Sequence, residues 1–234
     1  MIDTTTTRPQ SIFAKHETKA FPYQYAATIH VETIAGGVPS DEHVAEAYLR
    51  TKLAAKDDLI REAVAQTMVE RGITADEAVK LVDIKKHLNG FKRDEHGLYI
   101  EGRQLKAALK EAVSVAVAAG KIAPPNGAKG WGKTNKGLLG FMAEHVFVVD
   151  ERLHLGVTEA TGIVQRFISS FRGTGIQYEE YVENAEFNCT IIADYLFTEE
   201  HWALIWLTGQ QQGIGASRSQ GFGKYVVTRW ERIA

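Results

Sequence analysis

The stretch GQQQGIGASRSQGFGKYVVTRW, residues 209–230, decides the fold of this chain. It places five glycines between a Trp-containing apolar segment and a β-branched run. Glycine loses more backbone freedom on ordering than any other residue, so such a loop needs a reason. Either the backbone turns sharply against a packed sheet, or an anionic ligand approaches its bare amides. At Gly221 we expect a positive φ or close packing, so a β-branched side chain there would impair folding.

The segments around this loop predict a strand, a helix and a second strand. Residues 185–197, AEFNCTIIADYLF, alternate as a strand whose buried face carries Phe187, Cys189 and Ile191. Thr198 is a candidate N-cap for an apolar helix over 199–212, with two acidic residues in its first turn where the helix dipole favours them. Residues 224–233 then read as a closing strand.

The first part of the chain predicts one strand and then helices. Residues 25–34, YAATIHVETI, form an alternating strand whose inward face carries Ala27, Ile29 and Val31. From about residue 42 to 90 the chain is rich in helix formers, and Gly72 ends one helix there. Thr74 and Glu77 form a capping box for the next helix.

The middle of the chain predicts an amphipathic helix over residues 102–120. One face of this helix is apolar and carries Leu105, Leu109, Ala112 and Ala116. Another face carries three cations at spacing i, i+3 and i+7, namely Arg103, Lys106 and Lys110. Residues 121–140 are full of Gly, Pro and Lys and form no regular element. Short strands follow at 145–151 and from 162, the latter ending in a glycine turn.

Composition bounds the class of protein. With 234 residues, 44% hydrophobic and 24% charged, the chain fits one globular domain. We expect a loose segment over 1–20 and one domain over 21–234, interrupted by a helical insertion at 42–90 and a basic loop at 121–140. The N-terminus has no signal pattern, and no apolar run is long enough to span a bilayer. The single cysteine excludes an internal disulfide, and we expect a cytoplasmic protein.

Charge is unevenly distributed, although the net charge is only −2. Residues 98–140 carry seven cations and two acids, whereas residues 178–200 carry seven acids and no Lys or Arg. The chain therefore predicts a basic face, which is either a solvated surface or a nucleic-acid contact. The two Trp residues of the C-terminal helix are predicted to be core residues: Trp202 and Trp206.

The segment GAKGWGKT, residues 127–134, satisfies the phosphate-loop pattern G-x-x-x-x-G-K-[ST]. Its context differs from that of a nucleotide hydrolase. Two prolines stand where the preceding strand would end, and the glycines after Lys133 disfavour the helix that should follow. We therefore interpret it as a flexible basic loop.

Candidates for catalysis are few. The eight histidines show no metal-ligand spacing, so we expect no metal and no cofactor. His30 is a candidate acid–base residue or a structural histidine. Asp41 is a candidate catalytic acid or, beside Ser40, a helix cap.

The C-terminal loop, residues 213–227, resembles the glycine-rich loop of the RAMP superfamily, the RNA-binding proteins of CRISPR systems. The segment YIEGRQLKAALKEA, residues 99–112, is similar to the I-P-G-S-S-L-K-G-x-L-R signature of type III effector backbone subunits. Here Glu101 replaces the proline, Arg103 and Gln104 replace the serines, and Ala107 replaces a glycine. Residues 30–41, HVETIAGGVPSD, are less specifically similar to the first strand and glycine turn of those subunits.

The resemblance implies an α+β, ferredoxin-like (RNA-recognition-motif-like) antiparallel sheet. It implies a protein that binds guide-type RNA through its phosphates and stacks into a filament, either with copies of itself or with other effector subunits. Together with the basic segments, it gives these expected RNA-binding residues: Arg103, Lys106, Lys110, Lys129, Lys133, Lys136, Arg166, Arg172, Gly213, Gly215, Ser217, Arg218, Ser219, Gln220, Gly221, Gly223 and Lys224.

Two alternatives stay open. A metal-independent endoribonuclease of the same superfamily would use His30 as its base, whereas the cleaving aspartate of the backbone subunits would correspond to Asp41. A standalone or phage-borne relative would mimic or inhibit an effector complex.

Overall fold

The computed structural model describes residues 12, 16–39, 58–74, 77, 88–122, 142, 144–170 and 173–234. Its helices in this part of the chain are α1 (Glu17–Ala20), α3 (Asp58–Arg71), α5 (Gly102–Ala118) and α7 (Glu199–Gln212), with the 3-10 turn η2 (Arg218–Gln220). Its strands there are β1 (Tyr23–Ala35), β2 (Val38–Pro39), β3 (Leu88–Gly90), β4 (Lys92–Asp94), β5 (Gly97–Glu101), β6 (Val146–Val148), β7 (Arg152–His154), β8 (Gly162–Ser170), β9 (Gly173–Ala193) and β10 (Tyr225–Arg232).

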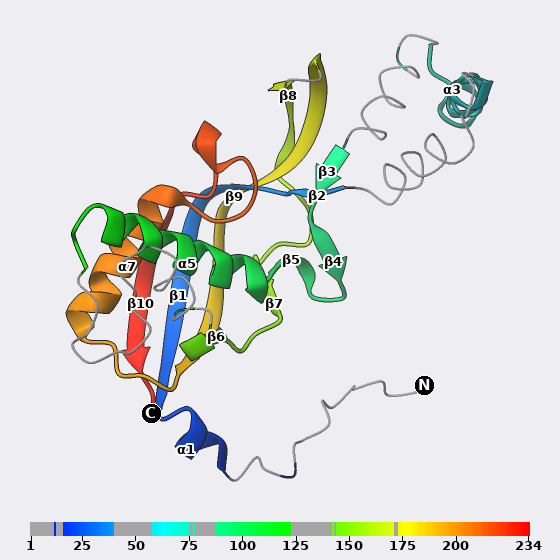
Figure 1. Ribbon diagram of the computed structural model, residues 1–234. Coiled ribbons are helices and arrows are strands. Elements are labelled where there is room, and N and C mark those ends of the chain that lie inside the picture. The colour runs from blue at the N-terminus through cyan, green and yellow to red at the C-terminus, as the bar shows by residue number, and fades with distance from the viewer. Residues whose placement is uncertain are drawn as a thin grey trace.

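The core is an antiparallel sheet in the order β10-β1-β9-β6. Along the chain these strands and the two long helices follow as β1, α5, β6, β9, α7 and β10. Figure 1 shows that α5 and α7 lie on the same face of this sheet. A split β-α-β arrangement with both helices on one face is the ferredoxin-like fold. The α+β, ferredoxin-like prediction is therefore confirmed.

The two predicted central strands are confirmed, and their alternation explains which face is covered. Ala27, Ile29 and Val31 of β1 are 0–2% exposed, and Phe187, Cys189 and Ile191 of β9 are 0–3% exposed. Successive side chains of a strand point to opposite faces, so the polar residues between them form the other face of the sheet. Burial raises the pKa of the Cys189 thiol to about 12, with a smaller contribution from Asp150, as expected of a core thiol.

The helix predictions are also confirmed. In α5 the residues of the predicted apolar face, Leu105, Leu109, Ala112 and Ala116, are all buried. The helix α7 begins after the predicted cap: the Thr198 side chain accepts a hydrogen bond from the His201 amide, and His201 Nδ1 accepts one from the Thr198 amide. Trp202 is 1% exposed, and its ring lies 5.2 Å from that of Tyr25 and 4.9 Å from that of Trp230. Trp202 and Trp206 are thus core residues, as predicted.

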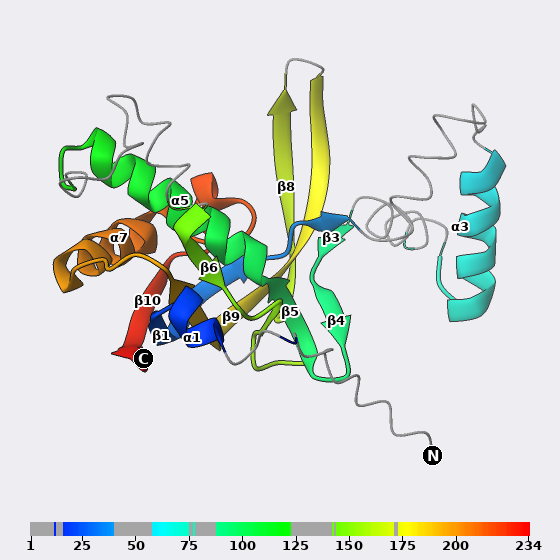
Figure 2. The same ribbon diagram turned by 60° about the horizontal axis from the view of Figure 1, so that its bottom comes forward.

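The strand β9 is longer than predicted. It runs over 21 residues, and its first part pairs with β8 in a hairpin that projects from the helix-covered sheet (Figure 2). The sequence predicted a glycine turn after the strand that starts at residue 162, but Gly173 and Gly175 belong to β9 (Gly173–Ala193). The pairing with β1 skips Asn184, whose φ is 53°. The register of the two strands is the same on both sides of Asn184, so no residue is inserted there. β9 passes from the core sheet into the hairpin at Tyr181, which pairs with Ala35 of β1 and with Gly162 of β8.

A second, smaller sheet was not predicted. It has the order β4-β5-β7, and its strands are three to five residues long. Strands this short carry too little alternation to be recognised in the sequence.

The predicted helical insertion is described only in part. The helix α3 ends at Gly72, whose φ is +62°, and the Thr74 and Glu77 capping contacts are present. Residues 88–90 belong instead to β3, which pairs with β9 and β2, so the helical stretch ends before them. The rest of 42–87, nearly all of 121–140 and most of 1–20 lie outside the described residues. Among the described helices, none is long and apolar enough to cross a membrane.

Candidate nucleic-acid interface

The glycine-rich loop is tightly packed against the end of β1. Gly213, Gly215, Gly221 and Gly223 all have φ between +77° and +92°. The Gly223 amide donates to the Thr33 carbonyl (2.7 Å), and the Ile214 amide donates to the Gly223 carbonyl (2.9 Å). A Cβ at position 223 would collide with the Ile214 carbonyl oxygen. Of the two reasons for the glycines, the sharp turn against a packed sheet is therefore the one that the backbone itself satisfies.

The prediction for Gly221 was a positive φ or close packing, and the positive φ is found. Its φ of +92° confirms the left-handed backbone, but a Cβ at this position would meet nothing within 4 Å. Of the two alternatives, the positive φ therefore holds for Gly221, and close packing is found at Gly223.

The polar side chains of the loop hold it to neighbouring elements. The Ser217 hydroxyl donates to both carboxylate oxygens of Glu179 (2.9 and 2.7 Å), and Arg218 Nη1 donates to Glu111 of α5 (2.5 Å). These two residues were predicted as donors to RNA, and in the protein alone each has an acidic partner. Ser219, Gln220, Gly221 and Lys224 are exposed.

Arg166 joins the β8–β9 hairpin to the same loop. Its side chain is 5% exposed, and its Nε forms an ion pair with Glu179 Oε2 at 3.2 Å. The two groups are not aligned for a hydrogen bond. Its Nη1 donates to Gln220 (2.5 Å), and the guanidinium lies 4.1 Å from the centre of the Phe222 ring. A buried charge needs such partners because leaving water is costly. Arg166 therefore orders the loop from beneath.

The cationic stripe of α5 is present at the start of that helix. Arg103 is 78% exposed and donates to Glu101 Oε2 through Nε (2.8 Å) and Nη2 (2.5 Å). Lys92 of β4 donates to the other oxygen of Glu101 (3.1 Å). Hydrogen bonds from Arg103 and then Lys92 hold the pKa of Glu101 below its ordinary value. One carboxylate thus draws two cations from different elements to the same place.

Lys106 lies one turn further along α5. Its Nζ is 4.2 Å from the centre of the Phe147 ring of β6, a cation–π contact. Burial, and secondarily the charge of Lys110, lowers the pKa of Lys106. An anion placed beside Lys106 would offset both effects, so this is a favourable position for a phosphate.

The surroundings of Gly102 explain why the helix motif has a glycine at this position. Its amide donates to the Glu151 carbonyl (2.9 Å), and a Cβ at this position would collide with the Asp150 carbonyl oxygen. The loop between β6 and β7 can therefore approach the first turn of α5 only because residue 102 has no side chain. That first turn contains no acidic residue, and its N-cap, Glu101, makes no side-chain cap.

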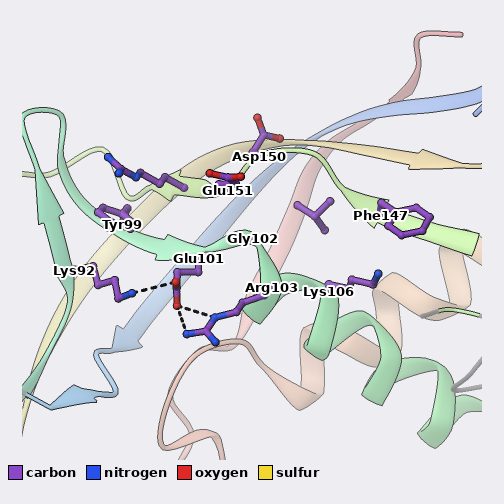
Figure 3. A pocket seen from close by; sticks show the side chains of 11 residues that line it. Lys92, Tyr99, Glu101, Gly102, Arg103, Lys106, Phe147, Asp150 and Glu151 are labelled. Carbon is purple, nitrogen blue, oxygen red and sulfur yellow. Dashed lines mark hydrogen bonds and ion pairs between the residues drawn. The ribbon is translucent and has the colours of Figure 1, made fainter. Parts of the chain in front are cut away.

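A cavity of about 490 Å³ lies at this junction. Figure 3 shows Lys92, Glu101 and Arg103 on one side of it and Asp150 and Glu151 on the other. A second cavity of about 410 Å³ shares Lys92 and Tyr99 with the first.

A third cavity, of about 130 Å³, lies between α5 and the glycine-rich loop, from Gln104 to Arg218. We call these three hollows together the α5 groove. The groove brings together the helix motif, the glycine-rich loop and, through a narrow hollow lined by Gly36, Gly37 and Gly215, the turn after β1.

A cluster of charged and aromatic side chains lies at the rim of the groove, and no pattern in the sequence indicates it. Its members are Asp94, His96, Tyr99, Arg152 and His154. Asp94 Oδ2 accepts from Arg152 Nη1 (2.7 Å), and both Asp94 oxygens lie 3.0 Å from His154 Nε2. Burial alone would raise the pKa of Asp94, but hydrogen bonds from His154, the His96 amide and Arg152 outweigh it and lower the pKa to about 2. Asp94 and His154 are 60 residues apart in the sequence, so no local pattern signals their contact.

The remaining predicted site residues are not brought to the groove. His30 lies on the sheet face away from the helices, paired with Glu186 of β9 and Val226 of β10. Five others lie outside the described residues: Asp41, Lys129, Lys133, Lys136 and Arg172. The phosphate-loop look-alike is among the segments that the structure leaves undescribed. In the ranges that it does describe, no group of three or more His, Cys, Asp or Glu side chains could hold a metal ion.

Comparisons with known proteins give structural matches only. No family model matches the sequence, and no curated protein matches it. The chain is similar to one in the cryo-EM structure of the type III-B Cmr-beta bound to cognate target RNA, with a TM-score of 0.43 and 10% identity over 94% of this chain and 63% of that one. It is also similar to Cmr6 from Pyrococcus furiosus, with a TM-score of 0.41 and 11% identity over 88% of this chain and 98% of that one.

The chain spans less than two thirds of the length of the first of these relatives. The fold itself is defined by the strand order and the helix placement described above.

Proposed function

We propose that this protein binds single-stranded, guide-type RNA along the α5 groove as a CRISPR-associated RNA-binding subunit. The observation that carries the proposal is the convergence in one groove of the glycine-rich loop, the glycine turn after β1 and the cationic first turns of α5. Phosphate contacts of this kind position a strand without reading its sequence.

Two features of the first turn of α5 favour the binding of an anion. The N-terminal amides of a helix carry partial positive charge, and here no acidic residue in the first turn and no side-chain cap competes for it. Lys92, Arg103 and Lys106 lie beside this turn and line the same cavity. The exposed part of the glycine-rich loop, Ser219 to Gly221, faces solvent as a second contact, with Lys224 beyond it.

The sheet face that α5 and α7 leave uncovered is less suited to RNA than the α5 groove. Proteins with an RNA-recognition motif stack bases on aromatic side chains of that face. Here the corresponding central positions carry Thr28, His30 and Asn188, with Thr28 bonded to Asn188 (2.7 Å). Among the described residues of these strands the open face thus lacks a stacking platform at its centre, which favours the helix side for RNA.

The backbone-subunit role is part of the same proposal. Stacking would place the acidic face of one copy against the basic face of the next, and head-to-tail contacts that do not close by rotation form filaments. Glu179 and Glu180 are buried, so the exposed acids available for such a contact are Glu183, Glu186, Asp194, Glu199 and Glu200. We place the complex in the cytoplasm and extend the RNA path to Lys129, Lys133, Lys136 and Arg172.

The chain provides a matched pair of variants to test RNA binding. Arg103 and Arg229 are both exposed, and each is paired with a glutamate two residues away. Arg103→Ala should weaken binding of single-stranded RNA about tenfold, or about 1.4 kcal/mol, and flatten the slope of log K against log salt by about 0.7. Arg229→Ala, on β10, should change neither quantity. Fluorescence anisotropy at four salt concentrations measures both.

Equal effects of the two substitutions would contradict the groove as the binding surface. RNA-free, monomeric protein from a low-salt lysate, with no binding in the titration, would contradict RNA binding altogether.

A further inference from the structure

The walls of the α5 groove carry nearly balanced charge, although the proposed ligand is a polyanion. Six Lys and Arg residues and five Asp and Glu residues line its three hollows. The acids are Glu101, Glu111, Asp150, Glu151 and Glu180. RNA in the groove brings its phosphates close to these carboxylates, and charges of the same sign repel. The affinity for RNA therefore depends on which of these acids can move aside.

Glu111 of α5 is held in the groove by a single contact among the described residues. Its side chain is 44% exposed, and its carboxylate accepts a hydrogen bond from Arg218 Nη1 (2.5 Å). Glu180, by comparison, has a side chain that is 11% exposed, and it accepts hydrogen bonds from the Phe91 amide and from Arg93. Glu111 can therefore leave the groove by breaking one partly exposed ion pair, whereas Glu180 cannot.

The surroundings of Glu111 leave room for such a movement. Glu111 and Arg218 both line the hollow of about 130 Å³ between α5 and the glycine-rich loop. The α5 residues one turn before Glu111 also line it, and both are small: Ala107 and Ala108. The volume of this hollow is several times the share of one molecule of liquid water, about 30 Å³. An anionic group of a ligand therefore has space to approach the Arg218 guanidinium.

The backbone that carries Arg218 is fixed independently of Glu111. The preceding residue, Ser217, has a φ of +55°, which is uncommon for a residue other than glycine. Its hydroxyl donates to both carboxylate oxygens of the buried Glu179 (2.9 and 2.7 Å), and these bonds hold it in that conformation. Arg218 therefore stays at the hollow when its pair with Glu111 is broken, and its guanidinium can bind another anion.

We propose that Glu111 occupies Arg218 in the free protein and competes with RNA for it, so that a phosphate displaces this carboxylate when RNA binds. The inference rests on the proposed function, because RNA must enter the groove for the exchange to occur. Arg218 exchanges one anionic partner for another, so breaking the pair with Glu111 opposes binding. An exposed pair of this kind weakens RNA binding about two- to fivefold, which corresponds to about 0.4–1 kcal/mol.

The test is a titration of labelled single-stranded RNA with the full chain, followed by fluorescence anisotropy. Glu111→Gln keeps the size of the side chain and removes its charge, so it should bind RNA about two- to fivefold more tightly than the wild type. The gain should shrink as salt is added, because salt screens an exposed ion pair. Glu231→Gln is the matched control: Glu231 pairs with Arg229 on β10, and its loss should leave RNA affinity unchanged.

A double-mutant cycle separates competition for Arg218 from general repulsion between Glu111 and RNA. In a chain that already carries Arg218→Gln, the guanidinium for which the two anions compete is absent. Glu111→Gln should then leave RNA affinity unchanged, whereas general repulsion would give the same gain in both backgrounds. Melting temperatures of the three variants, which should stay close to that of the wild type, verify that the loop remains folded.

Two results would overturn the inference while RNA binding by the wild type stands. One is unchanged or weaker binding by Glu111→Gln, which would mean that Glu111 positions Arg218 for RNA instead of competing with it. The other is an equal gain in affinity with and without Arg218. If neither the wild type nor Glu111→Gln bound RNA, the proposed function would be contradicted as well, so the two failures are distinguishable.

Discussion

Gly221 and Gly223 allow the packing of the glycine-rich loop to be measured apart from its backbone conformation. Both have positive φ, at +92° and +77°, but only Gly223 lies against other atoms. Ala at 221 should cost only the left-handed strain, about 1–2 kcal/mol. For a chain of this size that lowers the melting temperature by roughly 2–8 °C.

Ala at 223 carries the same strain and two further costs. Its Cβ would collide with the Ile214 carbonyl oxygen, so the loop must move and give up the bonds of Gly223 to Thr33 and Ile214, about 1 kcal/mol each. Ile214 is 1% exposed, and partial loss of its burial adds about 1–2 kcal/mol. The sum, about 4–6 kcal/mol, corresponds to a fall in melting temperature of roughly 8–24 °C.

Calorimetry and urea unfolding of Gly221→Ala and Gly223→Ala measure the difference directly. Equal destabilisation of the two variants would refute the argument, because it would mean that φ alone, and not the contact with Ile214, requires glycine at position 223. RNA affinity of Gly221→Ala should stay normal at a temperature where the variant is folded.

Three more predictions follow from buried groups. The pKa of Asp94, about 2, lies below its ordinary value of 3.8, so ionised Asp94 stabilises the fold at neutral pH. This contribution is lost as the pH falls from about 4 towards 2. In urea unfolding, the free energy of unfolding of Asp94→Asn should therefore fall less between pH 4 and pH 2 than that of the wild type. The Cys189 thiol, with its pKa raised to about 12 by burial, should react with a chromogenic disulfide at pH 8 only as fast as the protein opens, and rapid labelling without denaturant would contradict its burial. Trp202→Ala should cost about 3–5 kcal/mol of unfolding free energy in a urea titration, and a loss below 1 kcal/mol would place Trp202 outside the core.

The parts of the fold that the sequence predicts are those with a repeating local pattern. β1, α5 and α7 were found because apolar residues recur with the period of a strand or a helix over ten residues or more. Strands of three residues, such as β4 and β7, contain too few positions for a period to appear. The length of β9 was missed because its glycine-containing beginning, Gly173 to Gly175, looks like a turn until β8 pairs with it.

In the candidate site, too, local features were predicted and long-range contacts were not. Residue types at the groove were predicted, since cations on one helix face and glycines in a loop are local features. Their partners were not: Arg218 meets Glu111 across 107 residues, and Ser217 meets Glu179 across 38. Which acid of the same chain a donor meets depends on tertiary packing, so the sequence does not indicate it.

The position of β1 between β9 and β10 has a consequence for biosynthesis. Thr28 bonds to Asn188 and accepts from Thr228, at sequence separations of 160 and 200 residues. At about 5–20 residues per second, β1 therefore waits roughly 10–40 s on the ribosome before its last neighbour is made. Such high contact order predicts slow folding. Nascent chains that stop before β10 would leave one edge of β1 unpaired, which makes this first strand a natural substrate for chaperones during synthesis.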